Sequence, residues 1–246
     1  EDPGFNDSDW KQVNLPHDYS IEQAYTQTGE AESGYLLGGT GWYRKSFTLD
    51  ESAVGKRIRI DFGGVYMNST VWVNGTQVGT HPYGYTPFSF DVTEYVNFGG
   101  DNVITVKVDH QTPSSRWYSG SGIYRSVDLT ITDPVHVDLY GTKIETPELA
   151  TDQTNVDTNI STTIVNDSAD EQSVTLIHTV FPKGGNTDEN IGTVTTAAQT
   201  VTAGGTADIE ATVQVTSPAL WSTDNPMLYT VRTDVIVNGE TVDTYD

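Results

Sequence analysis

Polar and apolar residues alternate strictly in three short segments of the chain, at 56–62, 70–73 and 102–108. Successive side chains of a β-strand point to opposite faces, so this alternation is typical of strands with one buried face. The chain shows no sustained run of apolar residues at the three- and four-residue spacing of an amphipathic helix. The pattern therefore predicts an all-β protein and argues against a helical bundle and most nucleotide-binding folds.

Two Asn-Gly pairs, Asn74-Gly75 and Asn238-Gly239, each lie between short alternating segments and predict tight β-hairpins. Both central residues of the favoured two-residue hairpin turn need a positive φ angle, which Asn and Gly accept readily. Further strands are expected in the first half, which then holds enough strands for a β-sandwich, near 41–49, 87–91, 126–132 and 136–143.

Aromatic residues divide the chain into two parts, because residues 1–140 hold 21 of the 25 Phe, Trp and Tyr. Pro147 breaks the chain just after the aromatic residues stop. We therefore expect one β-sandwich domain at 1–144 and an immunoglobulin-like sandwich at 145–246, with the boundary near 143–147. Strands belonging to the second sandwich are expected at about 135–145, 155–165, 172–181, 189–195, 206–215, 228–237 and 240–245.

The chain carries 34 acidic residues against 12 basic ones, and its formal net charge is −22. Such a surface repels phosphate, so neither nucleic acid nor an anionic membrane surface is an expected partner. The absence of cysteine excludes disulfides, thiolate metal ligands and a cysteine nucleophile. An acidic, Thr-rich, Cys-free β protein favours a secreted or cell-surface bacterial location, although a cytoplasmic one stays open.

The two ends of the chain suggest a piece of a longer protein. Residues 1–4 lack the basic and then apolar run of a signal peptide, and residues 242–246 complete a strand without a polar tail. No stretch of 18 consecutive apolar residues predicts a membrane-spanning helix. We expect a fragment.

Loops in the first half are rich in aromatic residues, Gly and His, at 15–21, 34–45 and 116–125. Aromatic faces stack on the C–H side of a pyranose, and charged groups bind its hydroxyls, so such loops can shape a sugar site. We expect Trp42, Tyr43 and Trp72, which lie on strands, to fill the sandwich core. Trp117 lies among glycines and polar residues, and both burial and exposure are open for it.

Ordered motifs of the first half are Trp10 with Leu15-Pro16-His17-Asp18, and the segments 41–45, 68–75, 84–88 and 121–125. Together they resemble the amino-terminal sugar-binding domain of glycoside hydrolase family 2, and most closely its β-galactosidase branch. The segments 218–222 and 225–229 independently resemble the immunoglobulin-like second domain of that family. The resemblance implies a jelly-roll-like, galactose-binding-type sandwich followed by an immunoglobulin-like sandwich.

Family members are retaining glycosidases whose two catalytic glutamates lie about 5 Å apart on a (β/α)₈ barrel that follows these two domains. The resemblance therefore implies a galactoside as substrate and a catalytic barrel as partner in cis. We expect no catalytic residue in this chain and no activity from it alone. The alternative is a free-standing carbohydrate-binding or surface-adhesion module, and a β-glucuronidase or β-mannosidase parent also stays open.

Some family members carry an acidic residue that reaches the sugar five positions before the equivalent of Ser121, where this chain has Arg116. A guanidinium donates hydrogen bonds but cannot accept them. We therefore expect Asp18 to supply the missing carboxylate, with Arg116 and Trp117 as further substrate contacts. The competing interpretation is that Asp18 caps the backbone of its own loop, with His17 beneath it.

No metal or cofactor is expected. The five histidines lack metal-ligand spacing, and no Asp-x-Asp-x-Asp loop for calcium occurs. The close acidic pairs at 30 and 32 and at 188 and 189 have no orienting surroundings in the sequence, and we expect them to be solvated surface groups.

Overall fold

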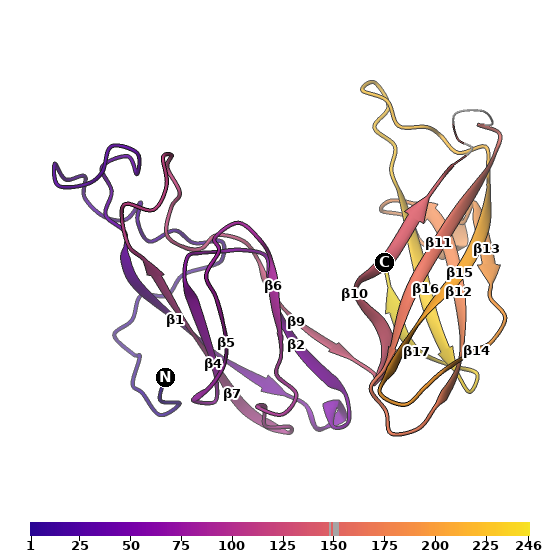
Figure 1. The fold of residues 1–246 in the computed structure, drawn as a ribbon, viewed down its shortest axis with the longest axis horizontal. Helices are drawn as coiled ribbons and strands as arrows, with labels where there is room; N and C mark the ends of the chain where they lie inside the picture. The colour runs from indigo at the N-terminus through magenta and orange to yellow at the C-terminus, as the bar shows by residue number, and fades with distance from the viewer. Residues whose placement is uncertain (148, 150–152) are drawn as a thin grey trace. The chain divides into compact units, whose positions relative to one another are not determined.

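The computed structural model describes residues 1–147, 149 and 153–246. The described residues form β-strands and two short 3₁₀ turns, with no α-helix among them. They divide into two compact units, Glu1–Ile131 and Thr132–Asp246 (Figure 1). No helix in this described part is long and apolar enough to cross a membrane. The all-β class expected from the alternating pattern is confirmed.

The division between the units lies before the expected boundary at residue 144. Strand β10, Val135–Glu145, pairs with β11, Asn155–Asn166, so it belongs to the second unit. The sequence boundary followed the loss of aromatic side chains, which comes only after this strand has begun. Pairing between strands, rather than aromatic content, decides which unit a strand joins.

The first unit is a jelly-roll-like β-sandwich. One sheet has the order β1-β7-β4-β5, a second has the order β6-β2-β9, and a short third pairs β3 with β8. Some neighbours in these sheets are distant in sequence, such as β1 and β7, which pair antiparallel along their whole length. The strands are β1 Gly39–Leu49, β2 Arg57–Phe62, β3 Val65–Tyr66, β4 Ser69–Val73, β5 Thr76–His81, β6 Phe88–Asp91, β7 Gly100–His110, β8 Gly122–Ile123 and β9 Val127–Thr132.

The core of the first unit follows the period of two. Ile58, Ile60 and Phe62 on β2 are buried, while the residues between them are only partly buried. Phe62 stacks on Phe88 with ring centroids 4.7 Å apart. Alternate side chains of β2 thus face the opposing sheet, as the sequence pattern predicts.

Of the three strand aromatics expected to fill this core, Tyr43 packs against the buried cluster and Trp72 is buried, with 8 % of its surface exposed. Trp42 is 37 % exposed and stacks on Trp72, with ring centroids 5.5 Å apart. Trp72 alternates with the core residues Val71 and Val73, so it points to the outer face of its sheet. The expectation therefore holds for the core position of Tyr43 and for the burial of Trp72, and it is wrong for Trp42.

The second unit is an immunoglobulin-like sandwich of two antiparallel sheets. One has the order β10-β11-β15, and the other has the order β13-β12-β16-β17 with β14 also paired to β12. The expected strand near 189–195 begins later, because residues 187–189 form a 3₁₀ turn, and β14 was not anticipated. The strands not yet given are β12 Gln172–Pro182, β13 Gly192–Thr195, β14 Gln199–Val201, β15 Gly205–Thr216, β16 Tyr229–Val237 and β17 Glu240–Tyr245.

Both expected Asn-Gly hairpins are confirmed, one in each unit. Asn74-Gly75 joins β4 to β5 with φ angles of 49° and 84°, and Asn238-Gly239 joins β16 to β17 with 54° and 83°. Positive φ at both central residues is the requirement of the primed turn, which matches the twist of the flanking strands.

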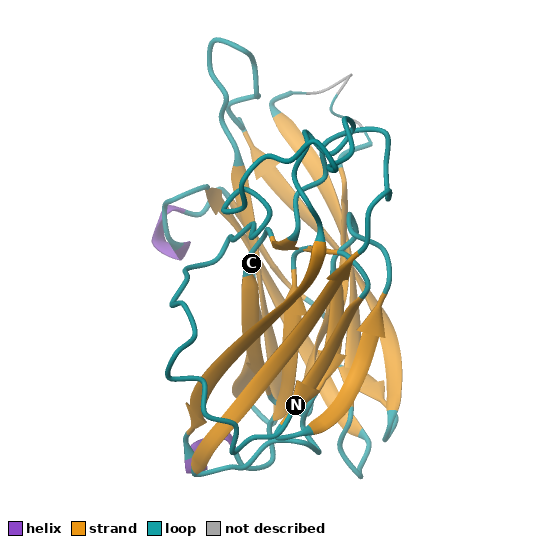
Figure 2. Cartoon of the chain, turned by 90° about the vertical axis from the view of Figure 1, so that its left-hand side faces the viewer, coloured by secondary structure: helices purple, strands orange, loops and turns teal. Residues whose placement is uncertain are grey.

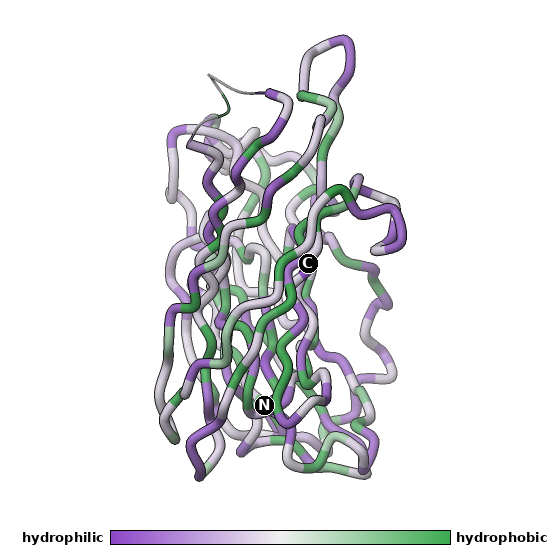
Figure 3. Tube along the Cα trace, turned by 90° about the vertical axis from the view of Figure 1, so that its right-hand side faces the viewer, coloured by the Kyte–Doolittle hydropathy of each residue, from purple (hydrophilic) through white to green (hydrophobic). Residues whose placement is uncertain are grey.

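A polar layer interrupts the core of the second unit. On β11, Thr162 lies between Ile164 of one apolar cluster and Ile160 of another. On β12, His178 lies in the same way between the two clusters, and its Nδ1 is 3.0 Å from Thr233 Oγ1. Figure 3 shows hydrophobic and hydrophilic residues alternating along the chain trace, as the strand pattern requires. The sandwich therefore has two apolar halves with polar side chains between them.

Candidate functional site

Loops at one end of the first unit form the candidate site. Several strands of this unit are joined by long connections that gather beyond the strand ends (Figure 2). There the segment 111–121 contacts both 16–20 and 82–87. The backbone N–H of His17 donates to the carbonyl of Ile123, and that of Tyr19 donates to the carbonyl of Ser121, each at 2.8 Å. The segment 16–20 is thus paired with the chain around β8.

Asp18 joins the segment 16–20 to the segment 111–121. Its Oδ1 accepts hydrogen bonds from the backbone N–H groups of Ser20 and Ser121, both at 2.9 Å, and from the Ser20 hydroxyl at 2.5 Å. Its Oδ2 accepts from the Tyr118 hydroxyl at 2.6 Å. Burial opposes ionisation, but these hydrogen bonds outweigh it and lower the pKa of the Asp18 carboxyl below its ordinary value. These contacts agree with the interpretation that Asp18 caps the backbone of its own loop, and they also join this loop to the segment 111–121.

Gly120 makes this arrangement possible. Its φ angle is +67°, and a Cβ atom at this position would lie 2.6 Å from Asp18 Oδ2. A larger residue would therefore be strained in its backbone and would displace the carboxylate.

His110 is a site residue that the sequence did not single out. It ends β7 and is only 2 % exposed. Its Nδ1 is 2.6 Å from Ser121 Oγ, and its Nε2 is 2.8 Å from Ser114 Oγ. The buried ring of Tyr66 packs edge-on against it. His110 therefore fixes both ends of the loop that carries Arg116 and Trp117.

The structure resolves the open question about Trp117, which is 58 % exposed. Its indole Nε1 donates a hydrogen bond of 2.6 Å to the hydroxyl of Tyr85. Tyr85 is 36 % exposed and packs edge-on against both Tyr66 and the exposed ring of Tyr83. Trp117, Tyr85 and Tyr83 form an exposed group of aromatic rings, which we call the aromatic platform.

Arg116 precedes the platform and is exposed. Its guanidinium makes no hydrogen bond or ion pair with any residue that the structure describes, and no ion pair joins it to Asp18. Arg125, by comparison, donates to the carbonyl of Gly63. The other four arginines each pair with an aspartate: Arg44 with Asp7, Arg57 with Asp91, Arg59 with Asp61, and Arg232 with Asp246.

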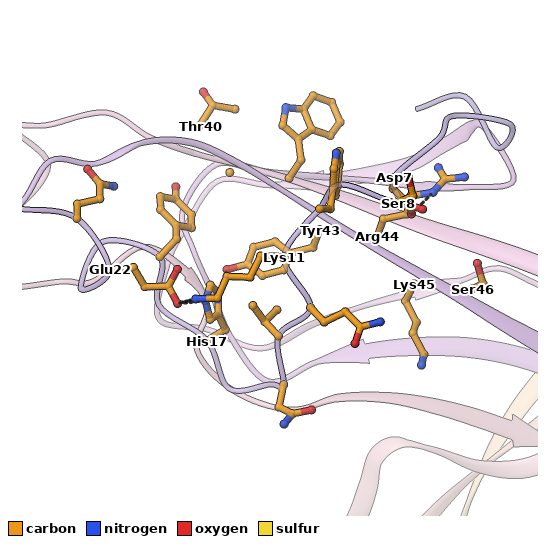
Figure 4. A pocket seen from close by; sticks show the side chains of 18 residues that line it. Asp7, Ser8, Lys11, His17, Glu22, Thr40, Tyr43, Arg44, Lys45 and Ser46 are labelled. Carbon is orange, nitrogen blue, oxygen red and sulfur yellow. Dashed lines mark hydrogen bonds and ion pairs between the residues drawn. The ribbon is translucent and has the colours of Figure 1, made fainter.

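A separate cleft of about 1400 Å³ lies between the N-terminal segment and β1 (Figure 4). His17 lines it, with Nδ1 2.8 Å from the hydroxyl of Tyr43 and Nε2 3.2 Å from Glu22 Oε1. Glu22 also pairs with Lys11. A carboxylate only accepts, so Nε2 donates to Glu22, and Nδ1 shares a hydrogen bond with the Tyr43 hydroxyl. These groups satisfy one another and hold the segment to the strand, so the exposed rings of the platform and the unpaired Arg116 are the better candidate for a ligand.

Comparison with known proteins identifies the family. Residues 9–134 match the sugar binding domain of glycosyl hydrolases family 2, and residues 136–246 match a further region of the same family. The chain belongs to glycosyl hydrolases family 2. This membership confirms the resemblance drawn from the sequence motifs.

Relatives within family 2 carry more than one activity in their names. Beta-galactosidase BoGH2A of Bacteroides ovatus is 41% identical over 99% of this chain, which covers 28% of that protein. A putative beta-glucuronidase of Formosa agariphila is 32% identical over 97% of the chain and 22% of its own length. A solved family 2 member from Bacteroides cellulosilyticus has a TM-score of 0.90 at 35% identity, covering 100% of this chain and 32% of that one. The chain thus spans about a third or less of these relatives.

Retaining glycosidases need two carboxyl groups about 5 Å apart at the reacting bond. The acidic pair at 188 and 189 lies on the exposed 3₁₀ turn Thr187–Glu189, close to Asn186, which caps it. Within the described residues of this family 2 chain, no group of three or more His, Asp and Glu is arranged to hold a metal ion. The chemical features that the structure does bring together are a preformed loop cluster, an exposed aromatic platform and an unpaired guanidinium.

Proposed function

We propose that this chain is the amino-terminal, non-catalytic part of a retaining β-galactosidase that removes terminal β-galactosyl residues. In this proposal a catalytic barrel elsewhere in the same protein supplies both carboxylates. The first unit contributes the loop cluster to the substrate-binding site, and the second unit connects it to the barrel.

The observation that carries this proposal is the family 2 match along the whole chain, together with 41% identity to a protein named beta-galactosidase. The small share of each relative that the chain covers supports the assignment of the chemistry to another domain. Names of other relatives include beta-glucuronidase, so the assay must compare both substrate classes.

Within this proposal the three residues singled out from the sequence have different roles. Arg116 and Trp117 are exposed and contact the substrate. Asp18 already accepts four hydrogen bonds from the loops, so it acts by positioning the segment that carries them. A carboxylate engaged in this way has little capacity left to accept from a sugar hydroxyl.

Chromogenic substrates test the proposal directly. The protein that contains this chain and its barrel should hydrolyse a 4-nitrophenyl β-galactoside faster than the matching β-glucuronide or β-mannoside. The chain of residues 1–246 alone should hydrolyse none of them, because the two positioned carboxylates are missing. Faster hydrolysis of the glucuronide would show that the substrate is a β-glucuronide rather than a β-galactoside. Turnover by residues 1–246 alone would overturn the assignment of the catalytic carboxylates to another domain.

A carbohydrate-binding or adhesion module is the competing outcome. Such a module should bind neutral galactosides at micromolar concentration without a barrel. A rim supplied by one domain buries little of a sugar compared with a closed pocket, so our proposal expects weak or undetectable binding of free galactose to residues 1–246. Calorimetric titration distinguishes the two.

A further inference from the structure

The aromatic platform is held in a fixed conformation. Trp117 is bound at its ring through Tyr85 and at its backbone, where its carbonyl accepts from the Ser115 hydroxyl at 2.6 Å. Tyr85 packs edge-on against Tyr66, which is only 3 % exposed and whose hydroxyl is 3.3 Å from Ser114 Oγ. Rings fixed in advance lose little entropy when a ligand binds, so they are suited to recognition.

The chemistry of the platform fits a sugar ring. The indole N–H is already used, so Trp117 offers a ligand mainly its exposed ring face. The Tyr85 hydroxyl accepts that bond and also interacts with the Tyr66 side chain, so it places a polar group at the edge of the platform. An apolar face beside hydroxyl groups matches a pyranose, which has one C–H face and polar edges.

The unpaired guanidinium of Arg116 favours a negatively charged ligand. In a chain with 34 acidic and 12 basic residues, every arginine except Arg116 and Arg125 is paired with an aspartate. Arg116 has no partner among the described residues and lies next to Trp117 in the chain. Guanidinium groups bind carboxylates and other oxyanions in a bidentate manner, and the negative field of the remaining surface would repel such groups elsewhere.

We propose that Arg116 and the platform formed by Trp117, Tyr85 and Tyr83 bind a pyranose unit that carries an anionic group, either a carboxylate or a sulfate. The sugar ring stacks on Trp117 and its oxyanion pairs with Arg116. This inference rests on the proposed function only in assuming that the substrate is a glycoside. It adds that the substrate carries a negatively charged sugar unit at this surface.

Titrations of residues 1–246 monitored by ¹H–¹⁵N NMR test the proposal without any need for turnover. The probes are methyl β-glucuronide, galactose 6-sulfate and neutral methyl β-galactoside. We expect the Trp117 indole N–H and the Arg116 Nε–H signals to shift with at least one anionic sugar, and the neutral sugar to bind about tenfold more weakly, the usual effect of losing one charge-assisted hydrogen bond. The probe that binds tighter distinguishes carboxylate from sulfate.

Matched variants make the result specific. Arg116→Ala should weaken binding of the anionic sugar about tenfold and leave the neutral one unchanged, whereas Arg125→Ala should change neither. Arg116→Lys should keep part of the affinity, because it retains the charge but not the bidentate geometry. Equal affinity for charged and neutral sugars, an equal loss with Arg125→Ala, or no shift at Trp117 would each overturn the proposal.

The same variants separate this inference from the proposed function. If the complete protein fails to cleave β-galactosides while residues 1–246 still bind an anionic sugar through Arg116, only the proposed function fails. If the complete protein is a β-galactosidase whose kcat/KM for acidic and neutral oligosaccharides falls equally in Arg116→Ala, only this inference fails.

Discussion

Two buried histidines, one in each unit, show how differently the units use polar groups. His110 in the first unit has both ring nitrogens within hydrogen-bond distance of serine hydroxyls and fixes the loop that carries the candidate site. His178 in the second unit bonds only through Nδ1, and its Nε2 has no partner among the described residues. The first ring holds a loop of the candidate site, whereas the second lies in a layer between two apolar clusters.

The other polar groups of the two units show a similar difference. Buried and half-buried polar groups of the first unit connect loops that are far apart in sequence, as Asp18 and Ser121 do. In the second unit the long strands β11 and β15 pair without interruption, as β1 and β7 do in the first. The first unit differs in the side-chain hydrogen bonds that join its loops at the candidate site. The predictions below test this difference from the largest expected effect to the smallest.

Core truncation should affect each unit separately. Phe62→Ala removes a ring that is 1 % exposed, and it should destabilise the first unit by about 3–5 kcal/mol. Leu176→Ala should destabilise the second unit by about 2–5 kcal/mol. The described core clusters share no residue, so we expect each variant to shift only its own unfolding transition in calorimetry. A shift of both transitions by either variant would contradict this view.

Removal of the Asp18 carboxylate should have the next largest effect on stability. Asp18→Ala leaves two backbone N–H groups and the Tyr118 hydroxyl without their acceptor, and it should cost about 2–3 kcal/mol in the first unit. The pKa of the folded carboxyl lies below the ordinary 3.8, so this stability is complete above that pH and is lost as pH falls through the folded value.

Asp18→Asn is the matched control, because its amide oxygen can still accept from the backbone but its nitrogen cannot accept from Tyr118. The melting temperature of Asp18→Asn should lie between those of the wild type and of Asp18→Ala. In the complete enzyme, a fall in kcat/KM that follows the melting temperature supports the positioning role. A fall in kcat/KM with an unchanged melting temperature would instead show that Asp18 contacts the substrate.

Strand positions were predictable because burial alternates along them, and this local signal is enough to locate β2, β7, β11 and β16. The face of the sheet to which each side chain points was predicted less well. Trp42 and Tyr43 are adjacent on β1, so only one of them can face the core, and the sequence alone could have excluded the idea that both do.

The candidate site was predictable only in part. The sequence singled out the loops and Trp117, but the bonds that shape them join residues such as Asp18 and Tyr118, a hundred positions apart. Such contacts depend on how the sheets bring the loops together, which no local pattern encodes. His110 was missed for the same reason, because it follows a regular strand and its role comes from Ser114 and Ser121.

The two histidines should also differ in their response to pH. Burial lowers the pKa of His178 below the ordinary 6.5, so the folded second unit keeps it neutral while the unfolded chain binds a proton. Stability of that unit is therefore complete above pH 6.5 and should fall as pH decreases from there toward the folded pKa.

Burial also lowers the pKa of His110, but the charge of Asp18 opposes this effect. Burial lowers the pKa of His81 in the first unit as well, so we expect both units to lose stability as the pH falls below 6.5. Urea unfolding at several pH values measures this, and His178→Gln should flatten the dependence of the second unit. An equal slope before and after that substitution would show that another group is responsible.

The smallest expected effects come from the two hairpin turns, which share the Asn-Gly sequence and nearly the same φ angles. Asn74 does more than turn the chain: its side-chain nitrogen donates to the Tyr95 carbonyl and to Asn102 Oδ1, and its oxygen accepts from the Val103 N–H. Asn238 makes no side-chain hydrogen bond within the part of the chain that the structure describes.

Glycine can adopt the positive φ angles of both turns, so replacing each asparagine by glycine isolates the contribution of the asparagine side chain to stability. Asn74→Gly should cost the first unit about 1–2 kcal/mol, because it removes one of the two donors to Oδ1 of the buried Asn102 and leaves the Val103 N–H without its acceptor. Asn238→Gly should change the second unit by less than about 0.5 kcal/mol. Chemical unfolding of both variants measures the difference. Equal costs would mean that the side-chain network around Asn74 adds nothing beyond the turn itself, and that the first unit is as locally organised as the second.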